Sequence, residues 1–208
     1  MTTRPPSTQR PGYTVVVIDN SALPPLPPPP NWPRCYPIIY HDIETDFGEE
    51  STRRILRRSY LLFKFYVATL VAYSIANIVI AITFGDANEI IIQVISSILY
   101  LLILSFGDFL GRHLSLYFGF KTNLPSMFRY YFFGEAIVFF FILIVSIGFL
   151  NIQNEAGVVK LFENKFYVAG IFTSIFLLFA IVQTILHLIL ISQVYKHFRS
   201  QGFRICAC

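Results

Sequence analysis

The sequence contains few charged residues for its length. Only 13% of its 208 residues are Asp, Glu, Lys or Arg, whereas 55% are hydrophobic and the mean hydropathy is +0.60. A water-soluble domain of this composition would leave much of its apolar surface exposed to water. The scarcity of charge therefore argues against a soluble protein and favours a chain that lies mostly in lipid.

The sequence also lacks the motifs that usually carry catalysis or metal binding. It contains no H-E-x-x-H motif, no Cys/His quartet and no Gly-rich phosphate cradle. Cys35 and His41 share one segment, but no third group is present to orient them as a nucleophile and its base. We therefore expect no enzymatic activity, no cofactor, no metal and no nucleic-acid partner.

The first ten residues are polar and lack the apolar segment of a signal peptide, and residue 2 is not glycine. A cleavable signal peptide and N-myristoylation are therefore not expected. The first membrane span must itself direct insertion.

Four long apolar runs are present, at 65–84, 90–107, 131–150 and 166–190. Each is close to the ~20 residues with which an α-helix crosses about 30 Å of hydrocarbon. Helices are favoured over barrel strands because the runs do not alternate and because backbone groups in lipid must bond within their own segment. The predicted fold is an all-α membrane protein with a four-transmembrane-helix bundle at 65–195 and a short tail at 196–208.

Lysine and arginine are concentrated on one side of these spans. The turn between the first two spans has none, and the two lysines of the third connection are offset by two glutamates. The bias predicts that both termini and the middle loop are cytosolic, where thiols stay reduced and no structural disulfide is expected. The cations on this side include Arg53, Arg54, Arg57, Arg58, Arg112, Lys121, Arg129, Lys196, Arg199 and Arg204.

Residues 1–50 are predicted to form a cytosolic tail and juxtamembrane segment, in which the Pro-rich first thirty residues are disordered because they cannot bury enough surface to fold. A proline tract here should form a polyproline II helix. It either docks into an SH3, WW or EVH1 groove or acts as a semi-rigid spacer. The tract consists of Pro24, Pro25, Leu26, Pro27, Pro28, Pro29 and Pro30.

Both tails carry short signals. The stretch from Tyr40 to Ile43 has the spacing that clathrin adaptors bind as an added strand, although so loose a pattern often matches by chance. Cys206 and Cys208 lie beside a span and a basic stretch, which favours S-palmitoylation, with unmodified thiols as the alternative.

A short amphipathic helix is predicted at 51–64, capped by Ser51 or Thr52. Its apolar residues Ile55, Leu56 and Tyr60 recur at helical spacing, and four arginines occupy the opposite arc. Lying flat on the membrane, the helix would attract anionic lipid with about 1 kcal/mol for each arginine. In the alternative interpretation the arginines only set the topology.

The middle loop, 110–130, interleaves cations with aromatic rings, so it should hold to lipid headgroups. Together with the helix at 51–64 it would form a basic collar around the cytosolic end of the bundle. The alternative is an ordinary aromatic belt with snorkelling cations. The residues predicted to bind lipid are Arg53, Arg54, Arg57, Arg58, Arg112, Lys121, Arg129, Tyr117, Phe118 and Phe120.

Three stretches of the chain resemble one known family. Residues 31–43 read Asn-Trp-Pro, then Cys and Pro, then Tyr-His-Asp-Ile; residues 116–123 read LYFGFKTN; and the third span opens with YYFFGEAIVFFF. Together they resemble the membrane domain of the secretory carrier-associated membrane proteins (the SCAMP family). The middle stretch departs from the family pattern, because Leu116 and Phe118 replace a tryptophan and a basic residue.

The resemblance implies a tetraspan protein with cytosolic termini in the trans-Golgi network, recycling endosomes, secretory vesicles and plasma membrane. It implies a role in sorting and exocytosis, with phosphoinositide-rich membrane as a partner of the middle loop. Because the chain has no Asn-Pro-Phe triplet, the adaptor contacts of longer members are not expected. Ala68, Ala72 and Ala76 recur at every fourth position and suit close packing within the bundle or in a homo-oligomer.

Polar residues in the spans cost free energy unless they are paired. Asp108 and Arg112 have the i, i+4 spacing for a local ion pair, and Glu135 lies about one turn inside the third span on the same side. Gln183 and His187 share a face of the fourth span. These residues leave a small ion-coupled or proton-coupled transporter as the alternative function.

Overall fold

The structure, a computed structural model, describes residues 29–32, 40–150 and 157–203. The chain divides into two compact units, 1–41 and 42–208, which are considered separately. In the first unit, Asn31 Oδ1 accepts a hydrogen bond from the backbone N–H of His41 at 2.7 Å, and Pro29 and Pro30 are exposed. The predictions for Pro24, Pro25, Leu26, Pro27, Pro28, Cys206 and Cys208 lie outside the described residues.

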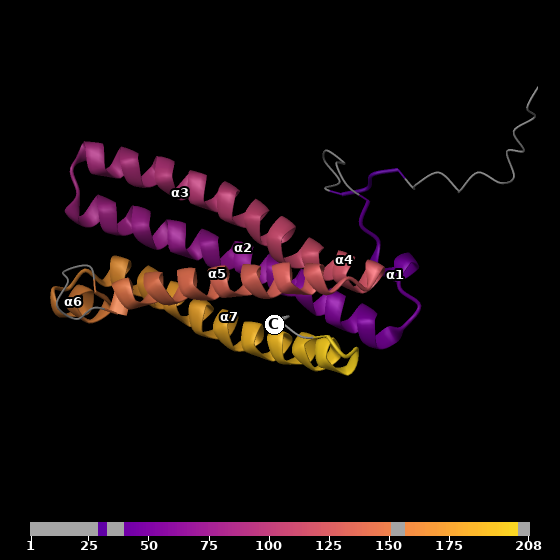
Figure 1. Cartoon of the computed structure of the whole chain (residues 1–208). Helices are drawn as coiled ribbons and strands as arrows, with labels where there is room; N and C mark the ends of the chain where they lie inside the picture. The colour runs from indigo at the N-terminus through magenta and orange to yellow at the C-terminus, as the bar shows by residue number, and fades with distance from the viewer. Residues whose placement is uncertain (1–28, 33–39, 151–156, 204–208) are drawn as a thin grey trace, which may run out of the picture. The chain divides into compact units, whose positions relative to one another are not determined.

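The second unit is built from helices (Figure 1). The described residues contain four helical segments long and apolar enough to cross a membrane: Glu50–Phe84, Ala87–Thr122, Pro125–Leu150 and Tyr167–Ser200. The predicted all-α, four-span fold is confirmed. The elements are α1 (Ile43–Asp46), α2 (Glu50–Phe84), α3 (Ala87–Asp108), the π-helix η2 (Phe109–Leu114), α4 (Ser115–Thr122), α5 (Pro125–Leu150), α6 (Val158–Glu163) and α7 (Tyr167–Ser200).

The structure corrects the separate amphipathic helix predicted at 51–64. These residues are the first part of α2, which continues into the first span because neither Gly nor Pro interrupts it. The apolar stripe of this part does not face lipid, since Leu56 is fully buried in a core with residues of α4, α5 and α7. The N-cap is Glu49 rather than Ser51 or Thr52, and its carboxylate accepts hydrogen bonds from both hydroxyls.

The predicted middle loop is also helical. η2 and α4 extend α3 to Thr122, and Asn123 ends this run in the left-handed conformation, with φ at 52°. Pro125 then begins α5, as its fixed φ and missing N–H favour. The cations and rings of this segment therefore sit on rigid helix faces.

The turn between α2 and α3 is set by two residues. A side chain at Gly85 would place its Cβ only 2.7 Å from the carbonyl oxygen of Ala81, so this close turn requires glycine. Asp86 caps α3 by accepting a hydrogen bond from the backbone N–H of Glu89 at 2.9 Å.

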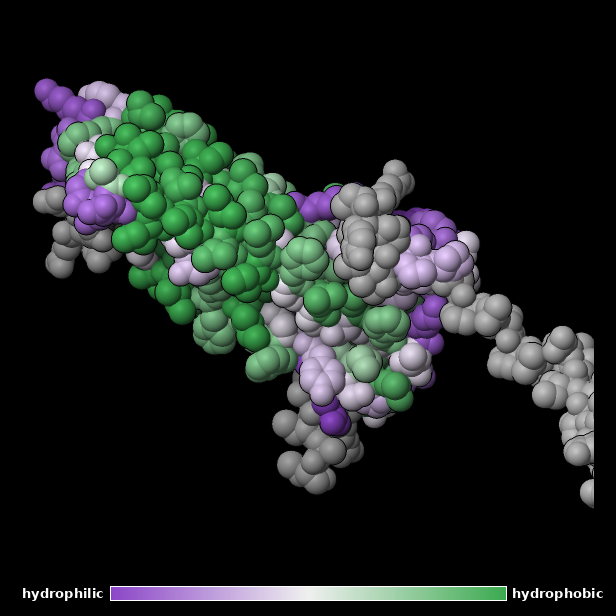
Figure 2. All heavy atoms as spheres, turned by 90° about the horizontal axis from the view of Figure 1, so that it is seen from above, coloured by the Kyte–Doolittle hydropathy of each residue, from purple (hydrophilic) through white to green (hydrophobic). Residues whose placement is uncertain are grey.

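Packing divides the unit into two hydrophobic cores. One lies at the end where α2 begins and α7 finishes, and it joins Leu56 to aromatic residues such as Tyr117, Phe128 and Phe198. The other lies among α2, α5 and α7 farther along. On the face seen in Figure 2, hydrophobic side chains form a continuous band along the long helices, with hydrophilic residues at the ends, as expected for a unit surrounded by lipid.

Candidate functional site

Five polar side chains from three of the four membrane-spanning segments meet in the interior. Asp108 ends α3 and Arg112 lies in η2, while Glu135 comes from α5 and Gln183 and His187 come from α7. All five side chains are buried. We call this group the buried polar network.

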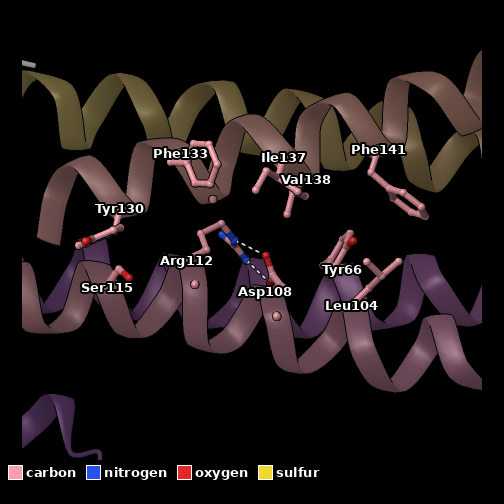
Figure 3. A pocket seen from close by; sticks show the side chains of 13 residues that line it. Tyr66, Leu104, Asp108, Arg112, Ser115, Tyr130, Phe133, Ile137, Val138 and Phe141 are labelled. Atoms are coloured by element: carbon pink, nitrogen blue, oxygen red, sulfur yellow. Dashed lines mark hydrogen bonds and ion pairs between the residues drawn. The ribbon is translucent and has the colours of Figure 1, made fainter. Parts of the chain in front are cut away.

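Arg112 is the centre of the network. Its Nε and Nη2 donate to Asp108 Oδ1 at 2.5 Å and to Oδ2 at 2.7 Å, a bidentate arrangement seen in Figure 3. Its Nη1 reaches across to α5 and donates to Glu135 Oε1 at 3.3 Å. The predicted i, i+4 ion pair is confirmed, and Glu135 joins it from the next span.

His187 connects the network to α7. Its Nδ1 bonds to Glu135 Oε2, and its Nε2 lies 2.7 Å from the amide nitrogen of Gln183. Both carboxylates and the guanidinium of the network thus have bonding partners, as charged groups buried within a bundle in lipid require.

Local backbone geometry brings the two sides of the network together. A Cβ at Gly134 would lie 3.1 Å from the carbonyl oxygen of Gly111, so the glycine at 134 allows α5 to approach η2 closely. The π-helical turn carries Arg112 between α3 and α5, and such turns often occur at functional sites.

A cleft of about 300 Å³ adjoins the network between α3–η2 and α5. Figure 3 shows the Asp108–Arg112 pair between the two helices, with apolar residues such as Leu104, Phe133 and Ile137 also lining the cleft. The lining is mainly apolar, and its two charged groups are already bonded to each other. The cleft therefore suits an apolar group better than an ion.

The four arginines of the predicted basic collar have different surroundings. Arg57 bonds to Glu44 through Nε at 2.8 Å and Nη2 at 2.5 Å, and this guanidinium holds the pKa of Glu44 below its ordinary value. Arg53 pairs with Glu50 at 2.9 Å. Arg54 and Arg58 are exposed and form no ion pair with a described residue.

Some predicted lipid contacts on η2, α4 and α5 are exposed and others are not. Phe118, Lys121 and Arg129 are exposed, and the Nζ of Lys121 lies 2.6 Å from Asp46 Oδ2. Phe120 is partly buried and packs edge-on against Phe128.

Arg112 and Tyr117 are corrections to the predicted lipid contacts, because both side chains are fully buried. Arg112 belongs to the buried polar network. The Tyr117 hydroxyl bonds to the Asp46 carboxylate and accepts from the backbone N–H of Asp42 at 3.2 Å, and the ring packs edge-on against Phe47. Tyr117 thus fastens α1 to α4 instead of meeting lipid.

The predicted adaptor signal from Tyr40 to Ile43 is also corrected at its second position. Ile43 begins α1 and is buried in the core that contains Leu56. An adaptor could bind this stretch as a strand only if α1 unfolded, because strand addition needs an extended and accessible segment.

Sequence reasoning missed two contacts of this site. It placed Gln183 and His187 on one face but did not foresee that Glu135 would bond to His187, 52 residues away. It also missed the contact between Ser59 Oγ and His113 Nδ1 at 3.0 Å, which links α2 to η2. The available signal was the presence of polar residues in apolar runs, which predicts pairing but not the partner.

The comparisons with known proteins give one match. The model of the SCAMP family matches residues 29–201, a range that contains every helix from α1 to α7. No curated protein and no solved structure matches the chain.

Proposed function

The chain belongs to the SCAMP family, and from this membership we propose that it sorts cargo in post-Golgi secretory and recycling carriers and takes part in their exocytosis. It is a multi-pass membrane protein of a vesicle-trafficking family. In the proposed mechanism, the cytosolic end of the helices holds anionic lipid, phosphoinositides included, while the tails recruit partner proteins.

One observation carries the lipid part of the proposal. Arg54 and Arg58 on α2 and Arg129 on α5 are exposed at the same end of the bundle, together with the rings of Phe118 and Tyr130. Each exposed cation near an anionic leaflet contributes about 1 kcal/mol of attraction. Rings beside them can insert at headgroup depth, as aromatic residues do at membrane interfaces.

The placement of this end in the cytosol rests on charge. An even number of spans puts the two ends of the chain on one side of the membrane, and the excess of Lys and Arg favours the cytosolic side. Pro29 and Pro30 are exposed and available to an SH3, WW or EVH1 partner, and acylated Cys206 and Cys208 would hold the C-terminal tail to the membrane.

The lipid contact is tested with full-length protein in nanodiscs of phosphatidylcholine, mixed with fluorescent vesicles that contain phosphatidylserine. Replacing two cations, Arg54→Gln and Arg129→Gln, should weaken association with the vesicles roughly 30-fold. Raising the salt concentration should also weaken association of the wild type. The control variant, Lys160→Gln with Lys165→Gln, changes two cations at the opposite end. Equal binding by the two double variants would contradict the proposed lipid contact.

The trafficking role is tested by imaging a tagged copy beside Golgi, endosome and plasma-membrane markers. We expect overlap with the trans-Golgi network and recycling endosomes. A copy that folds but never reaches a post-Golgi compartment would contradict the proposal.

The buried polar network favours a second candidate, a proton-coupled transporter. Glu135 and His187, from two different spans, share a hydrogen bond in the interior of the bundle, and carboxylate–histidine pairs of this kind serve as proton relays in transporters. This function predicts pH-dependent flux in proteoliposomes that Glu135→Gln alters. The absence of flux under every imposed gradient would remove it.

A further inference from the structure

A second groove, of about 780 Å³, runs between α2 and α7. Its floor is formed by Leu62 and Leu190, which are buried, and its rims include the exposed side chains of Leu61 and Ile189. At Ala68 the short side chain leaves the groove wide. The part of the groove around Ala68 is therefore an apolar channel that faces the surrounding lipid.

The polar residues of the groove gather toward the arginine-bearing end. α2 and α7 are antiparallel, so Arg58 and Gln193 lie toward that end, whereas Ala68 lies deeper in the membrane. Lys64 stands between these levels, but its Nζ lies 4.5 Å from the centroid of the Tyr60 ring, one turn back toward Arg58. Lys64 thus directs its charge toward the headgroup region, as long cationic side chains do near helix ends.

The two cations of the groove are not neutralised by a carboxylate. Arg58 and Lys64 form no ion pair with any residue that the structure describes, and Lys64 contacts only the face of the Tyr60 ring among the interactions described above. A phosphate beside them would therefore gain charge-assisted hydrogen bonds without displacing a protein carboxylate.

We propose that this groove binds one anionic phospholipid drawn from the cytosolic leaflet. Its phosphate lies beside Arg58 and Lys64, and one acyl chain follows the channel past Ala68. Phosphatidylserine and phosphatidylinositol carry a net negative charge, whereas phosphatidylcholine carries none. The site rests on the proposed cytosolic orientation and adds a stoichiometric lipid to the diffuse attraction of the basic collar.

A phospholipid explains both parts of the groove. A free phosphate would use the two cations but leave the channel empty, and a sterol would fill the channel but leave the cations unmatched. The order along the groove, with charge toward the membrane surface and apolar walls below, is the order of a phospholipid in its own leaflet. The helix walls also spare the ligand the cost of leaving the bilayer.

The site is tested by purifying the full-length protein from an equal mixture of phosphatidylserine and phosphatidylcholine and counting retained lipids by native mass spectrometry. The wild type should keep one phosphatidylserine. Arg58→Gln with Lys64→Gln should lower retention roughly 30-fold, since two cations are lost. Lys196→Gln, an exposed cation on α7 outside the groove, is the matched control and should retain the lipid.

A second variant protects the test from a folding defect. Ala68→Leu preserves the helix and both cations but places a branched side chain in the path of the acyl chain, so retention should fall here as well. Equal retention by Ala68→Leu, by the double variant and by Lys196→Gln would overturn the site, and so would equal retention of the two lipids by the wild type. Vesicle association through Arg54 and Arg129 is measured separately, so the groove and the proposed function can fail independently.

Discussion

The buried polar network and the groove between α2 and α7 use charge in opposite ways. In the network, Arg112 is fully enclosed and bonded to two carboxylates from different helices. In the groove, Arg58 and Lys64 have no ion pair with a described residue and lie beside an apolar channel. The difference separates two tasks: charges paired with carboxylates hold the spans together, whereas cations without an ion pair are available to an anionic ligand.

Removing the centre of the network should have the largest effect. Arg112→Leu leaves the carboxylates of Asp108 and Glu135 buried without their cation, which should lower the free energy of unfolding by about 3–5 kcal/mol. Thermal unfolding of the purified protein in detergent measures the loss. Arg54→Leu, on an exposed position, should change stability by less than about 0.5 kcal/mol, and a similar loss in both variants would mean that the network holds nothing together.

The close approach of α5 to η2 gives the next largest effect. Gly134→Ala places a Cβ 3.1 Å from the Gly111 carbonyl oxygen, and because this neighbour is backbone, α5 and η2 must shift by a few tenths of an ångström, at an expected cost of about 1–3 kcal/mol. Gly148→Ala is the control on the same helix, because no atom lies within 4 Å of its added Cβ. The control should be as stable as the wild type or more stable, since alanine favours helix. If the two variants melt at the same temperature, the contact at Gly134 is not tight.

The attachment of α1 to α4 depends on a neutral side chain, Tyr117, which is buried like Arg112. Tyr117→Phe keeps the ring against Phe47 but removes the hydroxyl that bonds Asp46, at a cost of about 1 kcal/mol. Faster hydrogen exchange in α1 is the expected sign. Tyr130→Phe changes an exposed hydroxyl and should leave the exchange of α1 unaltered.

The ion pair between Glu44 and Arg57 should give the smallest effect, and it depends on pH. Because Arg57 lowers the pKa of Glu44 in the folded state, the pair stabilises α1 fully above the ordinary carboxyl pKa of 4.5. The contribution is lost as the pH falls through the lowered pKa. Protection of the α1 amides, expressed relative to the intrinsic exchange rate at each pH, should therefore fall in acid for the wild type but less for Glu44→Gln. The same fall in both proteins would exclude this pair as the cause.

The sequence predicted the parts of the site that depend on local spacing. The i, i+4 pair of Asp108 and Arg112 and the shared face of Gln183 and His187 follow from helix geometry alone. The bond between Glu135 and His187 depends on how α5 and α7 are rotated toward each other, which apolar runs without polar periodicity do not specify.

The errors of the sequence analysis have a common physical origin. Positive charges near 112 and 121 were interpreted as the mark of a loop at the membrane surface, yet the segment contains no proline and continues as helix to Thr122. Arg112 was therefore assigned to lipid when it is enclosed by protein. A cation beside an apolar run can pair inside the bundle or face the headgroups, and only the packing of neighbouring helices decides between them.

The unbroken course of α2 has a mechanical consequence. Its 35 residues give a rod of about 52 Å, longer than the roughly 30 Å of hydrocarbon that it crosses. Because no proline or glycine hinge interrupts it, a pull or tilt applied at Glu50 by a partner of the tail would reach the Gly85 turn almost undiminished. A displacement at one face of the bilayer would thus be transmitted to the other face through α2 alone.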